Sequence, residues 1–221
     1  MLASLVGFGV LYLAAAIALG TPPKASDTGA AVAAWFRHNG GHVRIWVWLL
    51  TLGLPLFAVF ATLIRRVLPP VYRDVFFFGA IAFVVEIAGQ GWIWAGLALH
   101  GRQLGPATAR TVLDVAIYWG PVLISATVMT LAPIALLALR ERAGLPRWLG
   151  IVTLVALLEQ LIETVTLFGN RGFIAPGGPM NLFLGAGLTA LAWLSLAVAV
   201  SRPTRRGTAA PIAESPIGAS S

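Results

Sequence analysis

Two glutamates lie four residues apart in the apolar stretch VTLVALLEQLIETVTLF, residues 152–168. Side chains at positions i and i+4 of a helix are neighbours on one face, where like charges repel each other. A carboxylate at the centre of a bilayer also costs about 2.5–3.5 kcal/mol to insert. We therefore expect that one of Glu159 and Glu163 holds a proton at neutral pH, or that a cation lies between them.

Further polar and aromatic residues continue this pattern at helical spacing. The four polar stripes are Glu159, Glu163, Thr166 and Asn170; Glu86, Gln90 and Trp94; Arg44, Trp48, Thr51 and Pro55; and Asp114, Tyr118, Pro121 and Ser125. We expect them to meet in one polar, aromatic-walled cavity in the outer half of the membrane, open to the outer side. The candidate ionisable or catalytic residues are Glu86, Asp114, Glu159 and Glu163. The candidate ligand-binding residues are Arg44, Trp48, Gln90, Trp94, Tyr118, Trp119 and Asn170.

The alternative for these side chains is structural. Polar side chains hydrogen-bond membrane helices to each other, with about 0.6–2 kcal/mol per contact, and Arg44 paired with a glutamate would be such a contact. Helix association does not require two acids on one helix face. The Glu159–Glu163 pair therefore favours a ligand, proton or catalytic site.

Other kinds of site have little support in the sequence. The spacing of His38, His42 and His100 matches no metal-binding motif. The chain has no cysteine, which excludes disulfides and thiolate ligands. Phosphate-binding, dinucleotide-binding and serine-hydrolase motifs are absent from the sequence. We expect no metal and no other cofactor.

The elements that position these residues must be membrane helices. The 221 residues are 58% hydrophobic and 10% charged, whereas soluble domains carry about 25% charged residues. Six apolar runs approach or exceed the roughly 20 residues that cross a bilayer as a helix. The sequence therefore predicts an all-α, polytopic transmembrane bundle. The runs are Leu2–Leu19, Val43–Ile64, Val75–Leu99, Tyr118–Leu139, Trp148–Phe168 and Asn181–Val200.

The connecting segments have their own patterns. Residues 21–42 predict an amphipathic helix at the outer interface, capped by Ser26 or Asp27, and Pro106 predicts the start of a second outer helix. Residues 1–201 form one transmembrane domain in this interpretation, and residues 202–221 form a disordered cytoplasmic tail. An alternative for residues 2–19 is a cleaved signal peptide, but no basic residue precedes them.

The basic residues predict the orientation in the membrane. The loops after the second and fourth runs and the tail carry nine Lys and Arg residues, and the opposite side carries six. The positive-inside rule therefore predicts a multi-pass protein of the cell membrane with both termini in the cytoplasm. The net charge of +7 comes mainly from residues at the ends of apolar runs, so we expect membrane lipid as a partner and no nucleic acid.

Three stretches resemble a group of uncharacterised six-helix membrane proteins of actinobacteria. They are PPKASDTGAAVAAWFRHN, the RR that ends the following apolar run, and LPRWLGIVTLV. The resemblance covers most of residues 20–200. It implies a six-helix fold, and it implies no activity or catalytic residue, because the group has no agreed activity.

Two functional hypotheses follow. In the first, the cavity binds or transports protons or a small lipophilic or cationic molecule, with Glu159 and Glu163 as the ionisable pair. In the second, the protein is a membrane-embedded enzyme of the cyclase or isomerase type. A protonated glutamate would then act as general acid on an isoprenoid or other lipid, and aromatic faces would stabilise a developing cation. The sequence is compatible with both.

Overall fold

The chain folds into an all-α bundle in the computed structural model, which describes residues 1–141, 144–169 and 171–201. Within these described residues, six helical segments are long and apolar enough to cross a membrane: Leu2–Leu19, Gly29–Arg65, Pro70–Leu99, Pro106–Glu141, Arg147–Phe168 and Met180–Ser201. The prediction of an all-α bundle with six spans is confirmed. The proposed tail, residues 202–221, lies outside the described residues.

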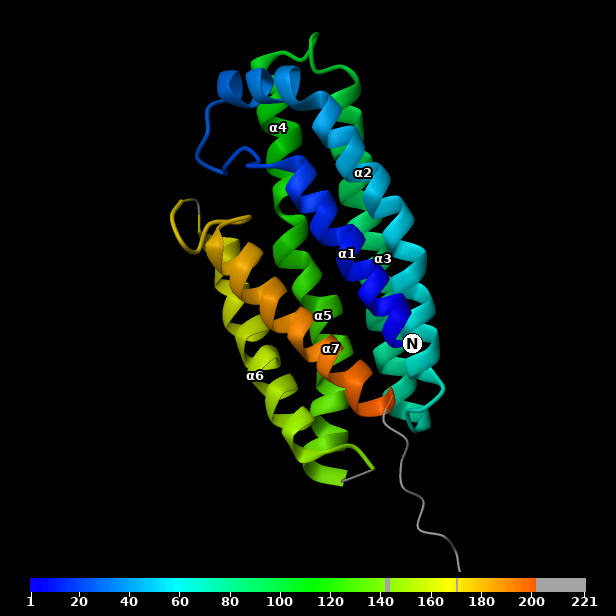
Figure 1. Ribbon diagram of the computed structural model, residues 1–221. Helices are drawn as coiled ribbons and strands as arrows, with labels where there is room; N and C mark the ends of the chain where they lie inside the picture. Colours follow the sequence, from blue (N-terminus) through cyan, green and yellow to red (C-terminus); the bar gives the residue numbers. More distant parts are fainter. Residues whose placement is uncertain (142–143, 170, 202–221) are drawn as a thin grey trace, which may run out of the picture.

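The spans pack in chain order. Helix α1 (Leu2–Leu19) packs on α2 (Gly29–Arg65), α2 on α3 (Pro70–Leu99), and α3 on α5 (Trp119–Leu136). Helix α5 packs on α6 (Arg147–Glu163), and α6 on α7 (Ala186–Ser201), which returns to contact α1 (Figure 1). Each span therefore has at least two helical neighbours within the bundle.

The shorter elements extend or tighten the ends of these helices. Helix α4 (Pro106–Ile117) precedes α5, and a π-helical turn, Leu137–Glu141, follows it. Helix α6 continues as a 3₁₀-helix, Thr164–Phe168, and a π-helical turn, Met180–Gly185, leads into α7. The predicted helix start at Pro106 is confirmed.

The first outer segment differs from the prediction. Residues 29–65 form one continuous helix of 37 residues, about 55 Å at 1.5 Å per residue, rather than an interfacial helix followed by a separate span. Thr28 caps this helix by accepting a hydrogen bond of 3.3 Å from Ala31 N. The predicted cap Asp27 instead accepts one from Lys24 N at 2.8 Å. Figure 1 shows the first turns of α2 lying across the end of the bundle.

Aromatic side chains fill the space between four spans. Phe57 of α2 lies 4.8 Å from Phe83 of α3 and 4.7 Å from Trp193 of α7, between ring centroids. Phe8 of α1 joins them at 5.1 Å from Phe57. Trp193 Nε1 donates a 3.2 Å hydrogen bond to Thr130 Oγ1 of α5, so the one polar atom of this indole is satisfied.

Candidate functional site

The two glutamates of α6 are buried on one face, as their spacing predicts. Only 7% of Glu159 and 1% of Glu163 is exposed. Gln160 lies between them, and its Nε2 donates hydrogen bonds of 2.9 Å to Glu159 Oε2 and 2.7 Å to Glu163 Oε2. One neutral amide thus bridges two like carboxylates.

The segment before α7 completes this cluster. Asn181, in the turn Met180–Gly185, donates a hydrogen bond from Nδ2 to Glu163 Oε1. Gly185 lies against Glu163 Oε2 so closely that a Cβ at this position would overlap the carboxylate. Gly120 of α5 faces the Asn181 amide, where a Cβ would lie 2.6 Å from Oδ1. Three spans therefore enclose the cluster, which we call the carboxylate pair site: Glu159, Gln160, Glu163 and Asn181.

The carboxylate pair site has no basic partner within the described residues. The ion pairs among the described residues lie elsewhere: Arg65 and Arg73 pair with Asp74, and Arg110 pairs with Asp114. The second oxygen of Glu159, Oε1, is buried and has no hydrogen-bond partner in the part of the chain that the structure describes. The site therefore has a free acceptor and no positive side chain to balance it, which suits a proton or a cation.

The predicted stripe on α3 also faces the interior. Gln90 and Trp94 are buried and Glu86 is half-buried. Glu86 Oε2 and Trp94 Nε1 are buried without a hydrogen-bond partner among the described residues. The Trp94 ring packs on other rings rather than on an open space: its centroid lies 5.5 Å from those of Phe36 and Trp46.

The predicted stripe on α2 faces outward. Trp48 is 60% exposed, and Arg44, Thr51 and Pro55 are exposed too. Arg44 Nε donates a hydrogen bond of 3.3 Å to Gly40 O of its own helix. It forms no ion pair with a glutamate among the described residues.

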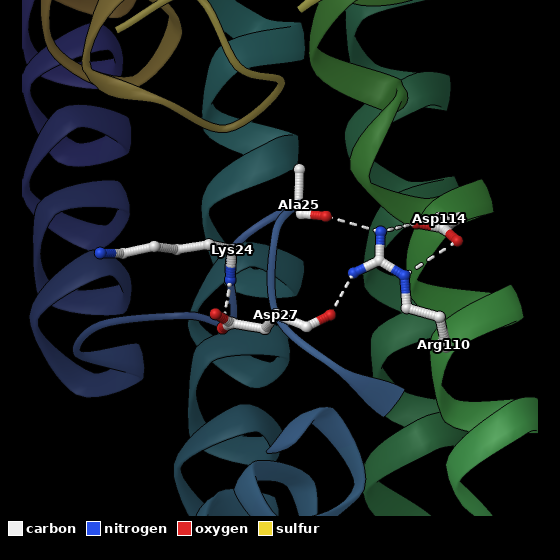
Figure 2. A network of polar contacts seen from close by, with 5 residues as sticks. All are labelled: Lys24, Ala25, Asp27, Arg110 and Asp114. Carbon is white, nitrogen blue, oxygen red and sulfur yellow. Dashed lines mark hydrogen bonds and ion pairs between the residues drawn. The ribbon is translucent and has the colours of Figure 1, made fainter. Parts of the chain in front are cut away.

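The predicted residues of the fourth span are partly outside the bundle. Tyr118 is 41% exposed. Asp114 pairs with Arg110, which also donates hydrogen bonds of 2.6 Å to Ala25 O and 2.7 Å to Asp27 O (Figure 2). Asp114 thus holds an arginine that fastens the α1–α2 loop to α4. Asn170 and the side chain of Trp119 lie outside the described residues.

Sequence reasoning missed Asn181 and Gly185 as parts of the site. In the sequence, Asn181 is only the start of an apolar run, and Gly185 lies within that run without a motif that marks it. The signal was an amide residue at the beginning of an apolar run, four residues before a glycine. Their contacts with Glu163 depend on how α7 packs on α6, which the spacing within one helix does not specify.

Two grooves lie elsewhere along α2 and α3, and neither is lined by an acidic residue from the described part of the chain. Because the α2 stripe is exposed on the outside of the bundle, it does not line a cavity with the other three stripes in the part of the chain that the structure describes. Among the described residues, His, Asp and Glu side chains form no group of three or more that could hold a metal ion. Comparison with protein-family models, with curated proteins and with solved structures found no match.

Proposed function

We propose that this integral membrane protein binds or transports protons or a small cation, with the carboxylate pair site as the ionisable centre. The observation that carries the proposal is the burial of Glu159 and Glu163 side by side, bridged by Gln160 alone and without a basic partner among the described residues. Two such charges in a medium of low dielectric constant require compensation.

The hydrogen bonds indicate how the site would hold its ligand. Both oxygens of Glu163 accept hydrogen bonds, from Gln160 and Asn181. Glu159 accepts one and keeps Oε1 available. A proton or cation would therefore be taken up at Glu159, while Glu163 is held in place by its two amide partners. Protons and other cations would compete for this oxygen, so cation affinity should fall as the pH is lowered.

The position of the site supports exchange with one side of the membrane. Glu163 is the last residue of α6, and Asn181 lies in the first turn after the loop that joins the last two spans. Both are near the same end of their spans. The orientation predicted from the basic residues makes this the outer side.

The enzyme hypothesis has less support from the geometry. Acid-catalysed chemistry on an isoprenoid would need aromatic faces open to a developing cation. Trp94, the aromatic residue of the α3 stripe, packs instead on Trp35, Phe36 and Trp46. We therefore favour binding or transport.

Flux measurements test the proposal. The full chain would be reconstituted into vesicles that contain a pH-sensitive dye, and Na⁺, K⁺ and tetraphenylphosphonium would be added separately. We expect cation-dependent proton movement with at least one of them, and its loss in Glu159→Gln and Glu163→Gln. Glu141→Gln is the matched control, because Glu141 is exposed and remote from the site.

The outcomes separate a functional pair from a structural one. Folded Glu159→Gln and Glu163→Gln proteins with the same flux as the wild type would contradict the proposal and assign the pair to helix packing. Chemical conversion of a lipid substrate by the wild-type protein, without flux, would favour the enzyme hypothesis instead.

A further inference from the structure

A basic groove of about 410 Å³ lies between residues 36–44 of α2 and residues 98–103 at and after the end of α3. Its charged and polar side chains are Arg37, His38, Arg44, His100, Arg102 and Gln103, and no acidic side chain of residues 1–141, 144–169 or 171–201 lines it. None of the three arginines forms an ion pair with an acid among the described residues. The groove is therefore a concentrated positive site at one end of the bundle.

Two glycines allow the backbones to meet beside this groove. An ideal Cβ at Gly40 of α2 would lie 3.1 Å from Ala98 O, and one at Gly101 would lie 2.7 Å from Phe36 O. Both glycines line the groove. The close contact between α2 and the end of α3 therefore fixes the positions from which the arginines extend.

A second groove of about 330 Å³ continues along the same two helices. Its lining is apolar except for Thr51: Val47, Leu50, Thr51, Leu54, Pro55, Ala58, Val84, Ile87, Ala88, Gly91 and Trp92. It extends over residues 47–58 of α2, which is about 16 Å of helix. That length is about half of the 30 Å hydrocarbon core, or one leaflet.

The two grooves occupy one face of the helix pair. On α2, Arg44 in the basic groove is followed by Val47 and Thr51 in the apolar groove. On α3, Ala88 and Gly91 in the apolar groove are followed by Ala98 in the basic groove. These steps of three, four or seven residues keep side chains on one helix face. The grooves therefore lie one after the other on this face, which we call the seam: its basic part is at the end of the bundle and its apolar part is along the span.

We propose that this seam binds an anionic phospholipid, with its phosphate in the basic groove and one acyl chain in the apolar groove. Guanidinium groups match phosphate oxygens with paired hydrogen bonds. The C-terminal end of α3 contributes a partial negative charge of about one half, which the three full arginine charges outweigh. Leu99 of the basic groove and Trp92 of the apolar groove, 66% and 74% exposed, offer apolar surface to the lipid.

Lipid titration of the detergent-purified full chain, followed by native mass spectrometry, tests this site. We expect dioleoyl phosphatidylglycerol to bind more tightly than dioleoyl phosphatidylcholine. Arg44→Gln and Arg102→Gln should each weaken phosphatidylglycerol binding about fivefold. Arg44→Lys should weaken it less, because the positive charge is kept. Arg66→Gln is the control, because it removes the same charge from an exposed residue at the other end of α2. Equal affinity for the two lipids, or equal effects of all three arginine-to-glutamine variants, would overturn the proposal.

A second arm distinguishes a lipid from a soluble phosphate compound. Inorganic phosphate and glycerophosphoglycerol would be added as competitors, and Ala88→Phe would fill the apolar groove. We expect millimolar inorganic phosphate not to displace the lipid, and Ala88→Phe to weaken lipid binding without weakening glycerophosphoglycerol binding. Displacement by inorganic phosphate together with unchanged lipid affinity in a folded Ala88→Phe protein would assign the basic groove to a soluble anion instead.

Discussion

Gln160 donates a hydrogen bond of 2.7 Å from its side-chain amide to Glu163 Oε2. The same nitrogen lies 2.9 Å from Glu159 Oε2, so both amide hydrogens serve neighbouring carboxylates. An amide offers partial positive charge only, whereas an arginine in its place would neutralise one of the acids. Glutamine therefore fixes the geometry of the pair without adding a positive charge, as the proposed proton or cation site would require.

The two glutamates should respond differently to the same substitution. In Glu159→Gln the new side-chain carbonyl can still accept the hydrogen bond from Gln160. The new side-chain NH2 group then takes the position of Oε1, which has no partner among the described residues. Removal of a like charge offsets the burial of an amide group without an acceptor, so we expect the free energy of unfolding of this variant to stay within about 1 kcal/mol of the wild type. Thermal unfolding in detergent would measure it.

Glu163→Gln should be the less stable of the two. Both oxygens of Glu163 accept hydrogen bonds. In Glu163→Gln the new side-chain NH2 group would replace one of these oxygens and would face the NH2 group of Gln160 or of Asn181. We expect a loss of about 1–3 kcal/mol relative to Glu159→Gln. The reverse order of stability would show that the hydrogen bonds of the pair differ from those described.

Gly185 should tolerate no side chain. An added Cβ would overlap Glu163 Oε2 and lie 2.9 Å from Gln160 Nε2, so Gly185→Ala should displace the carboxylate. We expect a destabilisation of about 1–3 kcal/mol, measured by thermal unfolding, together with loss of cation-dependent flux. Gly187→Ala is the control, since a Cβ there has no neighbour within 4 Å. Equal stability of the two variants would contradict the close packing of α7 on the site.

The spans and the Glu159–Glu163 pair were predictable from the sequence because they depend on properties local to one helix. Apolar length specifies a span, and a spacing of four residues specifies a shared face. What that face meets depends on packing between helices. The stripe that contains Arg44 and Trp48 has the same spacing as the one with Glu159, yet it lies outside the bundle. Aromatic and basic residues at a membrane interface suit lipid contact as well as a cavity, so this difference could not be predicted.

The continuous course of α2 was missed for a related reason. Gly40 and Gly41 suggest a break when helix propensity alone is considered. In the structure Gly40 lies against Ala98 O, so the missing side chain allows the close packing of α2 on α3. A glycine that breaks a helix and one that permits helix contact look the same in a single sequence.

Gly79 should be required for the contact between α3 and α5. A Cβ there would lie 2.6 Å from Met129 Cβ and 2.8 Å from Ala126 O, and small residues at such positions let membrane helices approach closely. We expect Gly79→Ala to lower the free energy of unfolding by about 1–3 kcal/mol. Gly89→Ala, in the same helix and with no neighbour within 4 Å of its Cβ, should be neutral. Denaturant titration of both variants would measure the difference, and a neutral Gly79→Ala would place the two helices farther apart.

Arg110 should control the order of the loop between α1 and α2. Its guanidinium donates hydrogen bonds to Ala25 O and Asp27 O, and Asp114 holds it from the next turn of α4 (Figure 2). In Arg110→Gln both carbonyls lose their charged donor. Hydrogen bonds to charged groups contribute about 1.5–3 kcal/mol, so the loop amides should exchange about tenfold faster or more.

Hydrogen–deuterium exchange of residues 21–28 would measure this change. The amides of Lys24 and Asp27 are the informative ones, because both are hydrogen-bonded within the loop. Asp114→Asn tests the contribution of the Asp114 charge separately from that of Arg110. In this variant Arg110 keeps its hydrogen bonds to the loop carbonyls, and the asparagine oxygen can still accept a hydrogen bond from Arg110. We therefore expect a smaller acceleration in Asp114→Asn than in Arg110→Gln. Equal exchange in both variants and the wild type would mean that the loop is held by other contacts, such as the 2.9 Å hydrogen bond from Trp35 Nε1 to Thr21 O.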